Sequence, residues 1–311
     1  MAGAIFLMGP TGCGKTALAV ALAERLPVEI VSVDSAMVYR GLDIGTAKPD
    51  RATLARAPHH LIDLCDPRES YSAGAFVRDA ERAMADIRGR GRIPLLAGGT
   101  MLYFRALAAG LSALPARDPE LRRTIDERAA REGWPALHAE LKRADPAAAA
   151  RIAPSDAQRI QRALEVHLLT GKPISQGYRT GWRSEAGADA LRLVVAPADR
   201  GWLHERLALR LDAMMEKGFL GEVKNLYARG DLTLSNPALR AVGYRQLWAH
   251  VSGEQSLEQA QARALSATRQ LAKRQMTWLR REPQAEWFDA AAATTGERVL
   301  ERVRTWVGGR A

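Results

Sequence analysis

Gly9-Pro10-Thr11-Gly12-Cys13-Gly14-Lys15-Thr16 decides the fold, because this stretch matches the phosphate-binding P-loop pattern G-x-x-x-x-G-K-T. The short apolar run from Ala4 to Met8 before it predicts a buried strand, and Thr16 to Leu26 after it predicts a helix. In this setting glycines let successive backbone N–H groups turn inward, and the helix N-terminus adds positive potential. Lys15 adds a full charge, and the Thr16 hydroxyl is a ligand for magnesium. The sequence therefore predicts a site for a di- or triphosphate.

The remaining chain predicts an α/β fold, with a P-loop NTPase-like parallel sheet core flanked by helices. Further strands are expected at Glu29–Val33, His60–Leu64, Ile93–Ala97, Leu191–Ala196 and Glu286–Phe288. Residues 116–187 are rich in Ala, Arg, Glu and Asp and poor in strand formers. We expect them to form an all-helical insertion domain, while 1–115 and 188–311 build the core with a basic, helical carboxyl-terminal part.

Composition narrows the class of protein. A hydrophobic fraction of 47% is ample for a large core, and a net charge of +10 favours a polyanionic partner, of which nucleic acid is the commonest. A basic surface kept for solubility explains the charge equally well. Cys13 and Cys65 are the two cysteines, so we expect no structural disulfide and a cytoplasmic protein. No apolar stretch reaches the length of a membrane span, and no Cys/His spacing suggests zinc.

Two strand ends beside the P-loop carry candidate catalytic residues. Asp34 follows the second strand, where a general base or a metal-binding carboxylate is useful, although a turn-capping role also fits. Gly98-Gly99-Thr100 follows a later strand and is a second candidate anion contact. Arg206 and Arg210 on a long helix either reach the phosphates or lie in solvent.

The basic residues gather in three segments. Gln158-Arg159 and Gln161-Arg162 lie near one end of a predicted helix, and a solvated helix face is the simplest explanation. Arg240-Ala241-Val242-Gly243-Tyr244-Arg245 suits contact with a nucleic-acid backbone and a base stacked on its aromatic ring. Gln261 to Arg281 is a basic amphipathic helix without an acidic residue, for which nucleic acid is the favoured partner.

Three hypotheses follow from these residues. A small-molecule P-loop kinase fits the loop and Asp34, but the basic carboxyl half then has no role. An ATP-driven nucleic-acid module lacks a clear Walker-B run ending in acidic residues. The third is an enzyme that uses the loop for a substrate's diphosphate and the basic half for RNA.

The segment from Asp34 to Pro49, DSAMVYRGLDIGTAKP, closely resembles the signature of bacterial tRNA dimethylallyltransferases (tRNA isopentenyltransferases, the IPP transferase family). Further segments resemble this family in the same order and extend the likeness to about Arg281: Gly98–Tyr103, Asp156–Arg159, Val242–Gln246 and Ala267–Gln275. Cys13 stands at a variable loop position, and Met37 leaves fewer hydrogen bonds to tRNA than a glutamine would.

The resemblance implies a reaction. A dimethylallyl group moves from dimethylallyl diphosphate to N6 of the adenosine 3′-adjacent to the anticodon of tRNA, diphosphate leaves, and no ATP is consumed. The P-loop with Mg²⁺ bound at Thr16 would hold the diphosphate, and Asp34 would accept the proton. Thr100 would lie at the catalytic centre, and Arg122 would be a further cation near the reacting groups. We expect the adenosine to be extruded from its stack, and the protein to act as a monomer away from membranes.

The resemblance also implies tRNA contacts. They map to Asp34, Ser35, Ala36, Met37, Gln158, Arg159, Ile160, Gln161, Arg162, Arg240, Ala241, Val242, Gly243, Tyr244, Arg245, Lys273, Arg274, Gln275, Met276, Thr277, Trp278, Leu279 and Arg280. The helical insertion would then hold the anticodon stem-loop.

Overall fold

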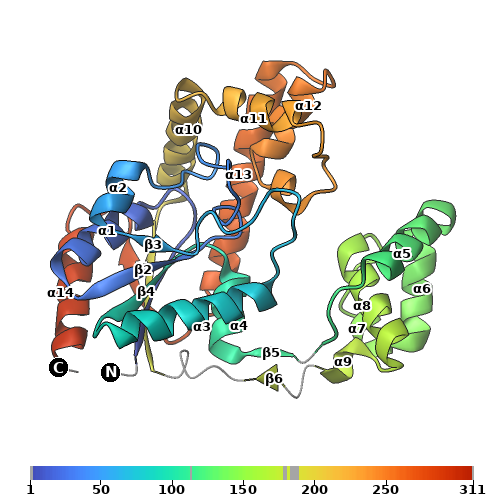
Figure 1. The fold of residues 1–311 in the computed structure, drawn as a ribbon, viewed down its shortest axis with the longest axis horizontal. Coiled ribbons are helices and arrows are strands. Elements are labelled where there is room, and N and C mark those ends of the chain that lie inside the picture. Colours follow the sequence, from blue (N-terminus) through green and yellow to red (C-terminus); the bar gives the residue numbers. More distant parts are fainter. Residues whose placement is uncertain (1–2, 113, 178–180, 183–188, 310–311) are drawn as a thin grey trace. The chain divides into compact units, whose positions relative to one another are not determined.

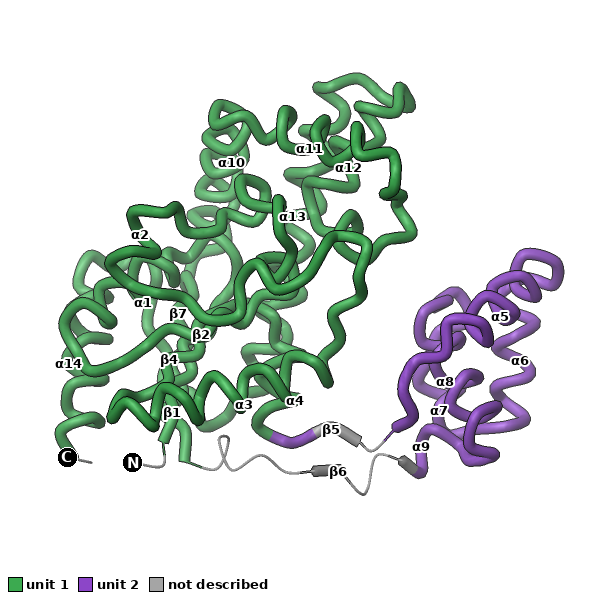
Figure 2. Tube along the Cα trace, in the orientation of Figure 1, with its two compact units in different colours: residues 1–108, 185–311 green, residues 109–184 purple. Residues whose placement is uncertain are grey.

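The computed structural model describes residues 3–112, 114–177, 181–182 and 189–309, and it divides into two compact units. Unit 1 comprises residues 1–108 and 185–311, and unit 2 comprises 109–184, coloured green and purple in Figure 2. The insertion expected at 116–187 thus has a counterpart whose boundaries lie a few residues earlier.

A six-stranded parallel sheet forms the centre of unit 1 (Figure 1). Its order is β3-β2-β4-β1-β7-β8. The strands are β1 (Ala4–Met8), β2 (Val28–Val33), β3 (His59–His60), β4 (Ile93–Gly98), β7 (Ala190–Ala196) and β8 (Glu286–Asp289). Because β1 lies between β4 and β7, the P-loop leaves the middle of the sheet at its carboxyl edge. This confirms the predicted parallel P-loop core.

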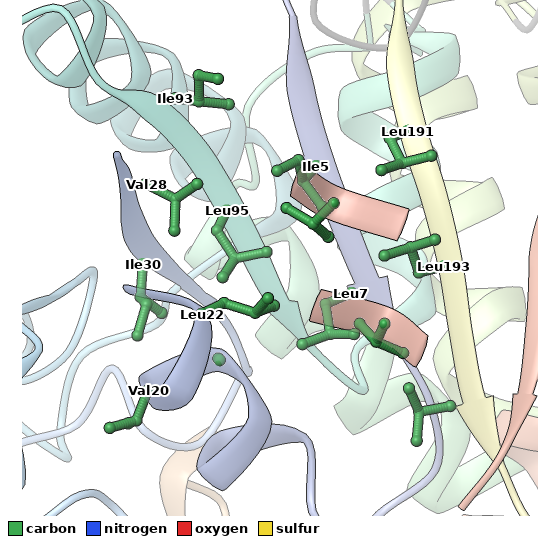
Figure 3. Packing of buried hydrophobic residues seen from close by; sticks show 14 of the residues in the cluster. Ile5, Leu7, Val20, Leu22, Val28, Ile30, Ile93, Leu95, Leu191 and Leu193 are labelled. Carbon is green, nitrogen blue, oxygen red and sulfur yellow. The ribbon is translucent and has the colours of Figure 1, made fainter. Parts of the chain in front are cut away.

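Alternate residues of the strands pack on opposite faces of the sheet. Ile5 and Leu7 of β1 belong to a core that includes Val20 and Leu22 of the helix after the P-loop (Figure 3). Phe6 points to the other face, where its ring lies 5.3 Å from that of Phe104. Burying both faces explains why these strands read as continuous apolar runs.

Helices follow most strands of unit 1. They are α1 (Lys15–Arg25), α2 (Arg51–Arg56), α3 (Ala73–Gly89), α4 (Met101–Ala109), α10 (Arg200–Glu216), α11 (Phe219–Ala228), the 3₁₀ turn η2 (Pro237–Arg240), α12 (Tyr244–Val251), α13 (Leu257–Leu279) and α14 (Thr295–Gly308). Side-chain caps set several helix starts, and Ser72, at the N-cap of α3, accepts the N–H of Ala75 at 3.1 Å.

Unit 2 is mostly helical and has its own core, which includes Ile125, Leu137, Leu141 and Leu164. Its elements are β5 (Leu111–Ser112), α5 (Pro119–Glu132), α6 (Trp134–Ala144), α7 (Pro146–Ala149), α8 (Ala157–Thr170), α9 (Ile174–Gly177) and β6 (Gly181–Trp182). The antiparallel ribbon of β5 and β6 was not expected in an all-helical insertion. Part of the loop expected at 175–188 lies outside the described residues.

The strand expected at His60–Leu64 is wrong, because β3 ends at His60. Leu61 and Asp63 have φ values of 65° and 55°, left-handed conformations that a strand does not contain. Along α10, Leu203 and Leu207 are buried and Leu211 is half-buried. None of the described helices has the length and apolarity that a membrane crossing requires.

Candidate active site

The loop between β1 and α1 has the backbone conformation that phosphate binding requires. Gly12 and Gly14 have φ values of 86° and 76°, in the left-handed region that glycine adopts without strain. Between them, Cys13 packs into a cluster with Leu203 and Leu207 of α10. Burial raises the pKa of the Cys13 thiol to about 11, so the thiol is neutral at pH 7. Cys13 therefore anchors the loop to α10, while the residues from Thr11 to Thr16 line a cavity.

Lys15 is the cation of this loop, and its surroundings lower the pKa of its ammonium group. Its Nζ donates to Pro10 O at 2.6 Å. Burial lowers the pKa of Lys15 to about 8, and Arg210 also lowers it, while Cys13 and Asp34 act in the opposite direction. An anion bound in the cavity would favour the charged form of Lys15. The electrostatics thus fit a phosphate-binding site.

Asp34 and Thr100 follow the neighbouring strands β2 and β4, and they are joined through Ser35. Asp34 Oδ1 accepts the N–H groups of Ala36 at 2.8 Å and Met37 at 3.3 Å. The Thr100 hydroxyl accepts the N–H of Ser35 at 3.1 Å. Asp34 Oδ2 has no hydrogen-bond partner among the described residues, so it is free to accept a proton from a substrate. The turn-capping and catalytic interpretations of Asp34 therefore apply to different oxygens of one carboxylate.

Arg210 of α10 reaches the site, which settles one alternative that the sequence left open. Its guanidinium donates to Thr46 O at 3.4 Å, and burial lowers its pKa while Asp34 raises it. Arg206, one turn earlier, instead lies over the Trp202 ring, with 5.4 Å between its Cζ and the ring centroid. Helical spacing placed the two arginines together, and only the packing of α10 separates their roles.

Gln275 of α13 joins the P-loop to the β4–α4 turn. Its Oε1 accepts the N–H of Thr11 at 2.9 Å, and its Nε2 donates to Gly99 O at 2.9 Å. The sequence resemblance placed this residue among the tRNA contacts. The structure shows its amide between the two loops of the site, and its contact with tRNA stays a prediction.

Two cavities meet at this point. The inner cavity has a volume of about 150 Å³ and is lined by the P-loop from Thr11 to Thr16. The outer cavity has a volume of about 490 Å³ and is lined in part by Thr100, Arg274 and Trp278. Six residues line both cavities: Thr11, Asp34, Thr46, Gly99, Arg210 and Gln275. The arrangement places a carboxylate and an arginine at the junction of a phosphate-type cavity and a larger, more apolar one.

Tyr244, expected to offer its ring to a stacked base, has a different role. Its side chain is fully buried, edge-on to Phe219 with 4.9 Å between ring centroids. Its hydroxyl donates to Glu222 at 2.5 Å, and burial raises the pKa of Tyr244 far above its usual range. The prediction that a base stacks on the Tyr244 ring is therefore wrong. Arg240 of the same segment is exposed and lines the outer cavity.

Glu222 of α11 is a site residue that sequence reasoning missed. Its carboxylate accepts three successive backbone N–H groups, from Asp43 at 2.9 Å, Ile44 at 2.7 Å and Gly45 at 3.2 Å. A Cβ at Gly45 would lie 2.2 Å from the Phe219 ring, so only glycine allows the loop to approach α11 this closely. A single glutamate on an amphipathic helix gives no sequence signal for such a contact.

Comparison with known proteins identifies the group of enzymes that shares these features. The family model described as IPP transferase matches residues 37–282, which include the loop held by Glu222 and all of α13. The chain belongs to the IPP transferase family. A second model, for the ATPase family associated with various cellular activities, matches residues 5–60, which contain the P-loop.

Relatives of this IPP transferase family member extend over almost the whole chain. A tRNA dimethylallyltransferase of Thioalkalivibrio sulfidiphilus is 56% identical over 98% of this chain and 97% of its own. One from Burkholderia thailandensis is 54% identical over 98% of this chain and 95% of its own. The resemblance noted from the sequence is thereby confirmed.

Solved structures agree with these relatives. A tRNA isopentenylpyrophosphate transferase of Bacillus halodurans is 35% identical with a TM-score of 0.71, and covers 99% of this chain and 96% of its own. A eukaryotic dimethylallyltransferase acting on tRNA gives a TM-score of 0.81 at 26% identity, and covers 100% of this chain and 81% of its own.

Other predicted site residues lie in unit 2 of this IPP transferase family member. Arg122 binds Glu165 through two hydrogen bonds of 2.7 Å, and Arg162 binds the same carboxylate at 2.6 Å. Burial of Glu165 would raise its pKa, but the two arginines lower it to about 2. Ile160 is fully buried, while Arg159 is exposed. Arg122 is thus one partner of a buried ion pair, and its expected catalytic role stays a prediction.

Residues of the basic helix α13 line two cavities on opposite sides of the helix. Thr268, Leu271, Gln275 and Trp278 face the outer cavity at helical spacing, together with Arg274. Arg269, Lys273, Met276 and Arg280 line a separate cavity against the start of α10. With 3.6 residues per turn, these two stripes lie about half a turn apart. The expected tRNA segment Lys273–Arg280 therefore does not form a single face.

Proposed function

We propose that this chain transfers a dimethylallyl group from dimethylallyl diphosphate to N6 of the adenosine 3′-adjacent to the anticodon of tRNA, releasing diphosphate. The observation that carries the proposal is the junction at which Asp34 and Arg210 line both cavities. A reaction that joins a diphosphate ester to a large acceptor needs two such compartments with its catalytic groups between them. The relatives named tRNA dimethylallyltransferase support the same reaction.

The inner cavity suits the diphosphate. The inward backbone N–H groups of the P-loop, the Lys15 ammonium and the Arg210 guanidinium are donors and charges where the leaving group gathers negative charge. Such prearranged donors favour the transition state more than the ground state. These groups bind the nucleoside phosphates of ATP-dependent proteins equally well, so the choice of dimethylallyl diphosphate rests on the outer cavity and on the relatives.

The outer cavity suits the isoprenoid carbon chain and an extruded adenine. Leu207, Leu211, Met214 and Phe219 give it an apolar wall, and Arg240 and Arg274 add charge for an RNA backbone. In the reaction, the bond between C1 of the dimethylallyl group and the diphosphate oxygen breaks, and that oxygen keeps the electron pair. N6 forms its bond to C1 and loses a proton to Asp34 Oδ2. The Thr100 hydroxyl, bonded to Ser35, holds the strand end that carries Asp34.

Magnesium is part of the proposal. Thr16, at the start of α1, has an exposed side chain and lines the inner cavity with Asp34. Hydroxyl and phosphate oxygens are ligands that Mg²⁺ prefers, and no group of three or more His, Cys, Asp or Glu side chains among the described residues could hold a metal alone. These residues fit a magnesium ion that Thr16 and the diphosphate hold together, where it would neutralise the charge of the leaving group.

We also propose that the protein works as a monomer in the cytoplasm. Cys13 and Cys65 are buried free thiols, which fits a reducing compartment. Unit 2 is proposed to hold the anticodon stem-loop through Gln158 and Arg159, which are exposed at the first turn of α8.

The experiment is incubation of the protein and Mg²⁺ with dimethylallyl diphosphate and an anticodon stem-loop, followed by mass analysis of the RNA. We expect one dimethylallyl group on the adenosine next to the anticodon, and none when that adenosine is replaced by guanosine. If the RNA stays unmodified while ATP is consumed with a small metabolite, the chain is a kinase and the proposal is wrong.

A further inference from the structure

A third cavity lies on the side of α13 that faces away from the outer cavity. It has a volume of about 180 Å³ and runs between the first turns of α10 and the second half of α13, which pack together in unit 1 (Figure 1). An ordered water needs roughly 10–15 Å³, so the space is ample for a ligand with several non-hydrogen atoms. Leu203 and Ala272 form its buried floor. We call this cavity the α10–α13 groove.

Cations line the α10–α13 groove. Arg200, Arg269, Lys273 and Arg280 belong to its lining, and no Asp or Glu does. Elsewhere in the described residues arginines commonly pair with carboxylates, as Arg229 does with Asp66 at 3.0 Å. None of the four groove cations forms an ion pair within the described part of the chain. Four like charges around one cavity repel one another, so an anion in the groove would relieve that repulsion.

One of these cations also lacks a hydrogen-bond partner, which such an anion would supply. The Nε of Arg269 is buried and has no hydrogen-bond partner. Arg200 Nε donates a hydrogen bond to His204 Nε2 at 3.3 Å. Because Nε2 is the acceptor, the imidazole is neutral and carries its proton on Nδ1. Burial lowers the pKa of His204, as do Arg269 and Arg200, whereas Asp199 raises it. Asp199 lies outside the groove lining, and its two oxygens accept the N–H groups of Gly201 and Trp202 at the start of α10.

We propose that the α10–α13 groove is a second phosphate-binding site, in which Arg269 and Arg200 bind the oxygens of a phosphate group. Guanidinium groups pair with phosphate through parallel N–H donors, and Lys273 and Arg280 at the rim add point charges. The phosphate group that the observations favour is a backbone phosphate of tRNA. This choice rests on the proposed function. Because the groove and the outer cavity lie on opposite sides of α13, this phosphate belongs to a part of the tRNA remote from the reacting adenosine.

The first arm of the test measures tRNA affinity across a series of salt concentrations. Each phosphate contact contributes roughly 0.7–0.9 to the slope of log affinity against log salt concentration. We expect Arg269→Gln and Arg200→Gln each to lower the magnitude of the slope by about that amount, and Arg269→Lys to restore most of it. Arg25→Gln is the matched control, since Arg25 is exposed at the end of α1 and forms no ion pair in the described structure. Unchanged melting temperatures show that the variants fold.

The second arm uses inorganic phosphate without RNA, so it does not depend on the proposed function. The pKa of His204 is followed by NMR, with His204→Gln to assign the signal and Lys15→Ala to remove effects of phosphate in the P-loop. Phosphate in the groove should raise the pKa of His204 in the Lys15→Ala protein, and Arg269→Gln should abolish the rise. A changed salt slope identifies tRNA as the source, and a phosphate-dependent rise alone identifies a free phosphate compound. Unchanged slopes together with an unchanged His204 pKa would overturn the proposal.

Discussion

Asp34 divides two tasks between the two oxygens of its carboxylate. Oδ1 holds the turn after β2 through the N–H groups of Ala36 and Met37, and Oδ2 is left for the substrate. Asp34→Asn retains an acceptor for these N–H groups but cannot take a proton. We expect its single-turnover rate to fall by roughly 10²–10⁴-fold, with little change in tRNA affinity. An unchanged rate would remove Asp34 from the role of base.

The lowered pKa of Lys15 predicts how the affinity for dimethylallyl diphosphate depends on pH. Its pKa is lowered to about 8 by burial, so the free protein loses this charge as the pH rises through that value. We expect affinity to be constant below pH 7 and to fall by about tenfold per pH unit above 8, until the pKa of the complex is reached. Calorimetric titrations between pH 6.5 and 9.5 measure this, and Lys15→Arg, which stays charged, provides the comparison. A similar decline in Lys15→Arg would assign the titration to another group.

The loop from Asp43 to Gly45 takes its shape from one residue of a helix far along the chain. Three of its N–H groups donate to Glu222, which also accepts the Tyr244 hydroxyl. We expect Glu222→Ala to lower the free energy of unfolding by about 2 kcal/mol, since hydrogen bonds to charged groups contribute about 1.5–3 kcal/mol each and this loop is only partly buried. The KM for tRNA should rise as well, because the loop lines the outer cavity. Glu216→Ala, at an exposed position at the end of α10, is the control, and equal denaturation midpoints for both variants would contradict the prediction.

Helices α5 and α8 of unit 2 are joined by the ion pairs of Glu165 with Arg122 and Arg162. The pKa of Glu165 is lowered from 4.5 to about 2, so its contribution to stability is present above pH 4.5 and is lost as the pH falls toward 2. We expect this loss to approach about 3 kcal/mol, and Glu165→Gln to be less stable at pH 7 and to lose less stability than the wild type as the pH falls. Urea unfolding of the wild type and of Glu165→Gln between pH 2 and 7 measures this dependence of the free energy of unfolding on pH. If the wild type and Glu165→Gln show the same pH dependence, the buried pair does not stabilise unit 2.

At the scale of the whole molecule, both cavities of the reaction site are lined by unit 1 alone. The chain enters unit 2 through β5 and leaves it through β6, and these two strands pair Leu111 with Trp182. A variant in which a short Gly-Ser turn joins these two residues should therefore fold. We expect it to bind dimethylallyl diphosphate as tightly as the wild type, and to bind the anticodon stem-loop at least about tenfold more weakly with a shallower salt dependence. Full retention of RNA affinity would contradict the role proposed for unit 2.

The sequence predicted the parts of this protein that local pattern controls. A glycine-rich loop between an apolar strand and a helix fixed the P-loop, and apolar runs separated by helices predicted the parallel sheet. Asp34 and Thr100 were found because parallel strands end at one edge, which is a consequence of chain direction. The sequence did not predict the end of β3 at His60, since leucine rarely adopts the left-handed conformation that Leu61 has.

Contacts between distant segments were decided by the tertiary structure. Glu222 holds a loop about 180 residues earlier, and Gln275 joins Thr11 to Gly99 across the site. Helical periodicity gives the angle between two residues of one helix but not the direction in which that helix faces. For this reason Arg210 could not be separated from Arg206, nor Arg274 from Arg269, before α10 and α13 were packed on the P-loop. Residue types and their order thus determined the fold and the reaction class, while side-chain packing over long separations decided which charged groups meet in each cavity.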